Sequence, residues 1–127
     1  MAPLTKDRAH GTHDGIQFGD PVAAGAVIYA GALVQLDAAG NALPAVAGGN
    51  TVRGIAMVQA NNAGGSAGDI TVEIRKGTFR FANNGLTRAD IGTIVKVTDD
   101  QTVGGAGAAD AGELVDIDAG GAWVKIS

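Results

Sequence analysis

The stretch DITVEIR, residues 69–75, decides the fold class of this chain. Its apolar residues Ile70, Val72 and Ile74 alternate strictly with polar ones, which is the pattern of a β-strand with one buried face. No long segment elsewhere in the chain repeats apolar residues at the 3.6-residue period of a helix. The sequence therefore predicts an all-β protein.

Strand and turn signals continue on both sides of this stretch. Lys76-Gly77 is predicted to make a turn, after which Phe79 and Phe81 share one face and are expected at the centre of the core. Upstream, residues 32–37 and 41–44 flank a Gly- and Asn-containing connection and predict a hairpin. Short strands joined by frequent turns are typical of a β-sandwich or a β-barrel.

The remaining segments fit the same architecture. Residues 52–59 predict a strand in which Gly54 marks a bulge or a close backbone approach. Residues 113–118 and 122–126 predict a closing hairpin, and residues 86–91 predict one helical turn capped by Thr87 and Asp90. We expect a small β-sandwich or β-barrel of short antiparallel strands with at most one short helical turn.

The N-terminal residues differ from the rest in composition. Residues 1–20 contain few large apolar groups and include three glycines, so they are expected to form an extended arm that becomes ordered on a partner. A frayed terminus is the alternative. Residues 21–127 are expected to form a single β-domain, since 127 residues suffice for one.

Charge and composition exclude several classes of partner. The net charge is −4 and the nine Lys and Arg residues are scattered, which argues against nucleic-acid binding. The longest apolar stretch, residues 22–36, is broken by Gly25 and Gly31, so no membrane span is predicted. Ala and Gly are abundant and aromatic residues are few, so the core is thin and we expect protein partners to add stability.

Few residues in the sequence suggest catalysis. His10 and His13 have a metal-like spacing, but two imidazoles on a Gly-flanked segment make a poor site without further ligands. The acidic pairs Asp99-Asp100 and Asp116/Asp118 fall in a turn and along a strand. We expect a protein that is not an enzyme, with no catalytic residues, no cofactor and no metal.

Trp123 is the only tryptophan and is predicted to point outward from the last strand. An outward Trp can anchor a partner protein. It can equally cover part of its own barrel, and both interpretations stay open.

The opening residues 2–8, APLTKDR, resemble the start of the small capsid decoration (cement) proteins of tailed bacteriophages. The resemblance covers nearly the whole chain and depends on the order and spacing of several segments. These segments are PVAAG (21–25), IYAGALV (28–34), KGTFRF (76–81), ADIG (89–92), VTDDQTV (97–103), DID (116–118) and WVKI (123–126).

The resemblance implies a β-tulip-like fold and a position on the outer surface of the virion capsid. There the protein would tie major capsid protein subunits together, as a homotrimer by preference or as a homodimer. We expect the partner-binding residues to be Pro3, Leu4, Thr5, Lys6, Asp7, Arg8 and Trp123. The alternatives are another virion structural β-domain, of the tail or of head completion, and a carbohydrate-binding β-module.

Overall fold

The computed structural model describes residues 2–8 and 13–127, and in this part the only helix is a single 3-10 turn. No helix of the described residues is long and apolar enough to cross a membrane. The strands are β1 (Gln17–Pro21), β2 (Val27–Ile28), β3 (Leu33–Leu36), β4 (Ala42–Pro44), β5 (Val52–Ala56), β6 (Ala60–Asn61), β7 (Thr71–Arg75), β8 (Gly77–Asn84), β9 (Ile94–Asp99), β10 (Thr102–Gly104), β11 (Asp110–Asp118) and β12 (Gly121–Ile126); the 3-10 turn is η1 (Arg88–Asp90). The predicted all-β class is confirmed.

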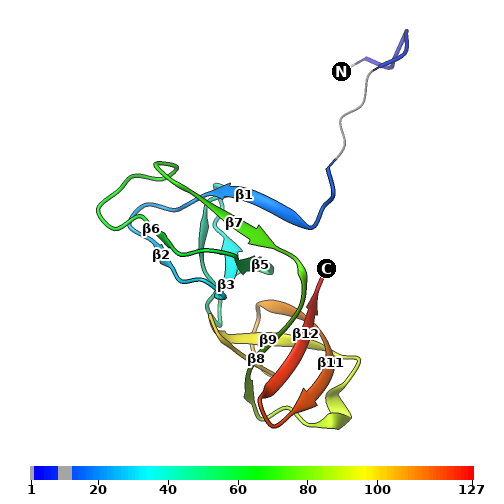
Figure 1. The fold of residues 1–127 in the computed structure, drawn as a ribbon. Coiled ribbons are helices and arrows are strands. Elements are labelled where there is room, and N and C mark those ends of the chain that lie inside the picture. Colours follow the sequence, from blue (N-terminus) through cyan, green and yellow to red (C-terminus); the bar gives the residue numbers. More distant parts are fainter. Residues whose placement is uncertain (1, 9–12) are drawn as a thin grey trace.

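Two β-structures, joined end to end, make up the body of the protein (Figure 1). The first is a five-stranded antiparallel sheet with the order β1-β7-β5-β3-β4, beside which β2 and β6 form a two-stranded sheet. The second is a closed barrel with the order β10-β8-β12-β11-β9, in which the β10–β8 pair is parallel. The first half of the chain therefore builds the sheet, and the second half builds the barrel.

Several local predictions are confirmed. In β7, Val72 and Ile74 are buried while Thr71, Glu73 and Arg75 are exposed, as the alternation requires. The β3–β4 and β11–β12 hairpins form where the sequence predicts them. The 3-10 turn η1 forms within the predicted residues 86–91, and the Asp90 carboxylate accepts the predicted bond from the Thr87 backbone N–H at 2.8 Å.

The predicted turn at Lys76-Gly77 is wrong. The chain continues from β7 directly into β8, leaves the five-stranded sheet and enters the barrel, where β8 pairs with β12 and β10. Both sides of β7 are already occupied by β1 and β5, so β8 has no place beside it. Glycine suits the crossing because the φ of Gly77 is 154°, which other residues rarely adopt, and a Cβ there would also lie 3.1 Å from the Phe79 ring.

The boundary of the N-terminal arm also moves. Residues 17–20 belong to β1 and pair with β7, so the β-domain begins at Gln17 rather than after residue 20. Phe18 and Asp20 explain the difference, because both side chains bind Arg53 of β5 and so tie this segment to the sheet.

The five-stranded sheet contributes to two hydrophobic cores. Leu33 and Ile55 point into the core that fills the barrel, whereas Val34 and Ile74 belong to a second core under β2 and β6. Adjacent residues of one strand thus serve opposite cores, as expected for a sheet that is buried on both faces.

Phe81 lies in the barrel core and is 6% exposed, as predicted. Phe79 is only partly buried and packs against the edge of that core, so the prediction that both rings lie at its centre holds for Phe81 alone. The rest of the barrel interior is aliphatic, with several alanines, which matches the expected thin core.

Candidate protein-binding surface

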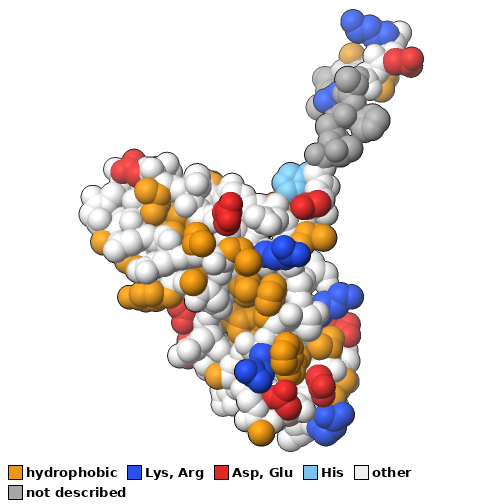
Figure 2. Space-filling view, in the orientation of Figure 1, with side chains coloured by type: hydrophobic (Ala, Val, Ile, Leu, Met, Phe, Trp, Pro, Cys, Tyr) orange, Lys and Arg blue, Asp and Glu red, His pale blue; other side chains and the backbone are white. Residues whose placement is uncertain are grey.

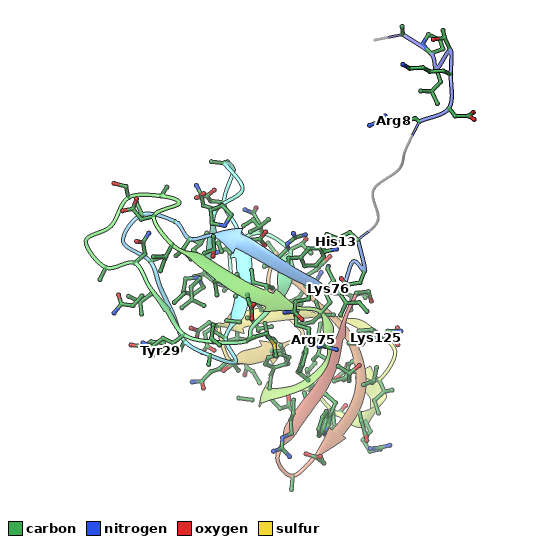
Figure 3. All side chains as sticks on the ribbon, turned by 45° about the horizontal axis from the view of Figure 1, so that its top comes forward. Arg8, His13, Tyr29, Arg75, Lys76 and Lys125 are labelled. Carbon is green, nitrogen blue, oxygen red and sulfur yellow. The ribbon has the colours of Figure 1, made fainter. Side chains whose placement is uncertain are left out.

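The segment that carries the predicted partner-binding residues Pro3 to Arg8 is exposed throughout residues 2–8. Leu4 is 71% exposed, the largest exposed fraction among the large apolar side chains of the described residues. The segment lies apart from both β-structures, and Arg8 marks its end in Figure 3. Its backbone and side chains are therefore open to a partner.

The chain enters β1 through a tightly bonded turn. The Asp14 carboxylate accepts hydrogen bonds from the backbone N–H groups of Ile16 at 2.9 Å and Gln17 at 3.2 Å. The bond from Ile16, followed by that from Gln17, lowers the pKa of Asp14 below its ordinary value. The His13 Nδ1 accepts a further bond from the N–H of Gly15 at 3.0 Å. These bonds fix the direction in which the chain leaves the sheet.

The Phe18 ring contacts two side chains at this turn. The His13 ring stacks on it with centroids 5.1 Å apart and an interplanar angle of 19°, and the Arg53 guanidinium lies 3.7 Å from the ring centroid. Arg53 also pairs with Asp20, with 2.9 Å between Nε and Oδ2. We call His13, Asp14, Phe18, Asp20 and Arg53 the root cluster.

The position of Arg53 follows from a bulge. Val34 pairs with Gly54 and Gln35 pairs with Val52, so Arg53 is the extra residue between them. A Cβ on Gly54 would lie 2.7 Å from the backbone oxygen of Arg75, so only glycine fits there. The predicted role of Gly54 is thus confirmed. The root cluster itself was not predicted, and the bulge glycine was its only signal in the sequence.

The free edge of β1 has few groups to offer an incoming strand. The backbone N–H and C=O groups of Ile16, Phe18 and every second residue after them point toward β7. The backbone groups of Gln17, Gly19 and Pro21 therefore point away from the sheet. The Gln17 N–H is taken by Asp14 and proline has no N–H, which leaves the Gly19 N–H as a donor. A partner strand therefore gains little by pairing with β1.

Trp123 lies on the outer wall of the barrel, since its neighbours Ala122 and Val124 are buried. Its Nε1–H donates to the Asp118 carboxylate at 2.8 Å, and the Arg80 guanidinium lies 5.5 Å from its ring centroid. This hydrogen bond is the main reason why the pKa of Asp118 is lowered. Trp123 thus stabilises its own hairpin, and the partly exposed face of the residue is the part open to a partner.

Trp123 and the arm do not form one site. Trp123 pairs with Arg80, three residue pairs along β12 from the Ile126–Gly77 pair. Gly77 follows Lys76, whose Nζ lies 6.0 Å from the ring centroid of Phe18 in the root cluster. Three pairs correspond to roughly 10 Å along a strand. The structure therefore gives two separate candidate contacts.

Three of the four acidic residues singled out by sequence have local partners: Asp99, Asp116 and Asp118. Asp99 accepts the Gln101 N–H at 2.9 Å, and Asp116 pairs with Arg88 at 3.1 Å. His10 lies outside the described residues. In residues 2–8 and 13–127, no three His, Cys, Asp or Glu side chains come together as a metal site.

The candidate surface thus consists of an exposed segment, the root cluster from which it leaves the sheet, and a tryptophan farther along the barrel. The chain matches no protein-family model, and neither a curated protein nor a solved structure matches it.

Proposed function

We propose that this chain is a structural capsid decoration protein of a tailed bacteriophage, bound to the outer surface of the assembled head. In this role it stabilises contacts between major capsid protein subunits. The observation that carries the proposal is the exposed segment of residues 2–8, which precedes a root cluster bound firmly to the sheet. The resemblance of this same segment to the start of capsid decoration proteins supports it.

The segment has the chemistry of a strand that is added to a partner. An extended segment pairs its backbone with an exposed sheet edge and places alternate side chains in pockets. Burial of the exposed Leu4 side chain would contribute about 1.5–3 kcal/mol. Lys6, Asp7 and Arg8 then supply charges that fix the register on the partner.

The few hydrogen-bonding groups on the free edge of β1 indicate which protein supplies the strand and which supplies the sheet edge. Because the edge of β1 offers little to an incoming strand, we propose that the capsid subunit supplies the sheet edge and this chain supplies the strand. Each contact can be weak, since many copies on one capsid add their binding.

The test is attachment to expanded heads that lack the protein. A variant without residues 1–12 keeps His13, Asp14 and β1, so it should fold with an unchanged thermal midpoint but fail to attach. A deletion of residues 1–20 is unsuitable, because it removes most of β1. Attachment is measured by cosedimentation with heads and by occupancy in electron micrographs.

A matched pair of point variants distinguishes the contribution of this segment to attachment from the general effect of placing a charge on the surface. Leu4→Asp should abolish attachment, whereas Val46→Asp changes an exposed apolar residue in the β4–β5 loop and should leave it intact. If the truncated chain decorates heads at full occupancy, the segment is not the attachment site. If the intact chain does not bind expanded heads, the proposed function is wrong.

A further inference from the structure

Tyr29 stands beside a hollow of about 490 Å³ that opens where the sheet meets the barrel. Its side chain is 62% exposed, more than that of any Phe or Trp in the described residues. Figure 2 shows hydrophobic side chains gathered across the middle of the molecule, and Figure 3 shows Tyr29 at the margin of the sheet. The volume of the hollow lies within the range of sites that bind small molecules.

The turn that carries Tyr29 forms one wall of the hollow, and hydrogen bonds hold it in place. The turn spans residues 29–32 and is closed by the Ala32 N–H, which donates to the Tyr29 carbonyl at 3.1 Å. The Gly31 N–H donates to the Ala56 carbonyl of β5 at 2.8 Å, which ties the turn to the sheet. The backbone that presents the Tyr29 ring is therefore fixed before any ligand arrives.

The turn between β9 and β10 forms the opposite wall and is held as firmly. The Leu33 N–H donates to the Asp100 carbonyl at 2.8 Å, and the Ala82 N–H donates to the Gln101 carbonyl at 2.9 Å. The Gln101 N–H in turn donates to the Asp99 carboxylate at 2.9 Å. A ligand does not have to order either wall, so less of its binding energy is lost on binding.

The side chains of Asp100 and Gln101 bring polar groups to the hollow. Within the described part of the chain, Asp100 has no ion-pair partner within 4.0 Å, and Gln101 is exposed. Arg80 also lines the hollow, but its guanidinium lies 5.5 Å from the ring centroid of Trp123 and is engaged there. A carboxylate accepts hydrogen bonds and an amide both donates and accepts them, so the pair can bind adjacent hydroxyl groups.

A flat exposed ring next to a carboxylate and an amide matches the chemistry of a sugar. A pyranose ring has a face of C–H groups and an edge of hydroxyl groups. The C–H face can pack on the apolar body of Tyr29, whose own hydroxyl stays in contact with water. The negative charge of Asp100 is unfavourable for an anionic sugar, so the hollow favours a neutral one.

We infer that this hollow binds a neutral saccharide, with one pyranose ring stacked on Tyr29 and its hydroxyl groups bonded to Asp100 and Gln101. Binding of this kind is a function additional to capsid attachment, and residues 2–8 take no part in it. The inference does not depend on the proposed function, since it concerns the free protein and a sugar.

The experiment is a titration of the full-length, isotope-labelled chain, followed by amide NMR. The probes are the methyl glycosides of glucose, galactose and mannose, with glucuronic acid as the anionic comparison. A single sugar ring in an open hollow binds with a Kd of about 1 mM. At least one neutral glycoside should give saturable shifts at the amides of residues 29–32 and 99–101. A neutral polysaccharide of that sugar then shows whether the hollow accepts a ring within a chain or only a terminal one.

Variants test the assigned contacts. Tyr29→Ala should weaken binding at least about tenfold, whereas Tyr29→Phe keeps the ring and should bind within a few-fold of the native chain. Asp100→Asn should weaken the neutral sugar several-fold and reduce the discrimination against glucuronic acid. Glu73→Gln removes an exposed carboxylate elsewhere on the sheet and should leave binding unchanged. Circular dichroism and the thermal midpoint verify that each variant is folded.

The outcomes decide the inference. It is overturned if none of the neutral glycosides shifts the amides of the two turns at about 10 mM, tenfold above the expected Kd. It is also overturned if the shifts centre on another part of the surface, such as the surroundings of Trp123, or if Tyr29→Ala binds as well as the native chain. Glucuronic acid that binds as tightly as the neutral sugars would contradict the role of Asp100.

Discussion

Replacement of Phe81 by alanine tests the central packing of the barrel. The Phe81 ring is 6% exposed and lies among the aliphatic side chains of the barrel core. Loss of a buried Phe ring costs about 3–5 kcal/mol, because the contacts disappear and the cavity fills only in part. A domain of this length has a total stability of roughly 6–19 kcal/mol, so the variant loses a large share of it.

Phe79 provides the matched comparison on the same strand. Its ring is partly exposed and packs on the edge of the same core, so Phe79→Ala should cost about half as much, roughly 1.5–2.5 kcal/mol. Sequence alone treats the two rings as equivalent, since they share one face of the strand. The difference between them is therefore a property of the barrel.

The assay is equilibrium unfolding in urea, followed by the fluorescence of Trp123, the only tryptophan. For a slope near 2 kcal/mol/M, Phe81→Ala should lower the midpoint by about 2 M. A loss below about 1 kcal/mol for Phe81→Ala would refute the reasoning. So would a larger loss for Phe79→Ala than for Phe81→Ala.

Three further predictions concern backbone contacts and one carboxylate. Gly112→Ala should destabilise the barrel by several kcal/mol, because a Cβ at this position would overlap a backbone carbonyl of β12. The control is Gly48→Ala, where a Cβ would meet no atom within 4 Å, and it should change the unfolding free energy by less than about 1 kcal/mol. Asn62→Ala should lower the free energy of unfolding in urea by about 1–3 kcal/mol, because the buried Asn62 amide donates to backbone carbonyls of two loops at 3.0 Å. A loss near zero would show that water takes over these hydrogen bonds. The pKa of Asp118 is lowered in the folded chain, so its bond to Trp123 should stabilise the fold fully at any pH above 3.8, the ordinary pKa of an Asp. This stabilisation should be lost as the pH falls through the lowered pKa of Asp118. Asp118→Asn should remove that step from an acid titration of stability, and a titration identical to that of the native chain would contradict the assignment.

Local pattern predicted the strands but not how they assemble. Strict alternation in residues 69–75 identified β7 and its buried face, and the short connections of the two hairpins made their partners neighbours. Alternation does not tell which sheet a strand joins, so the passage through Lys76-Gly77 was mistaken for a turn. The parallel β8–β10 pair likewise brings together strands that a helical turn and another strand separate in sequence.

The candidate surface was predictable to a similar degree. Composition singled out the N-terminal segment, because it lacks the apolar residues that would hold it to a core. The root cluster escaped prediction because Asp20 and Arg53 are 33 residues apart and meet only through the bulge at Gly54. Its effect is to move the start of the folded domain to Gln17.

The sheet shared between the two cores has a consequence for how the chain can be divided. The crossing from β7 to β8 looks like a natural place to cut, since sheet and barrel lie on either side of it. A fragment that ends there would leave Leu33, Val52 and Ile55 without the barrel side chains that cover them, and the barrel fragment would lose one wall of its interior. Neither half is then a self-sufficient folding unit, and heat should melt the intact chain in a single calorimetric transition.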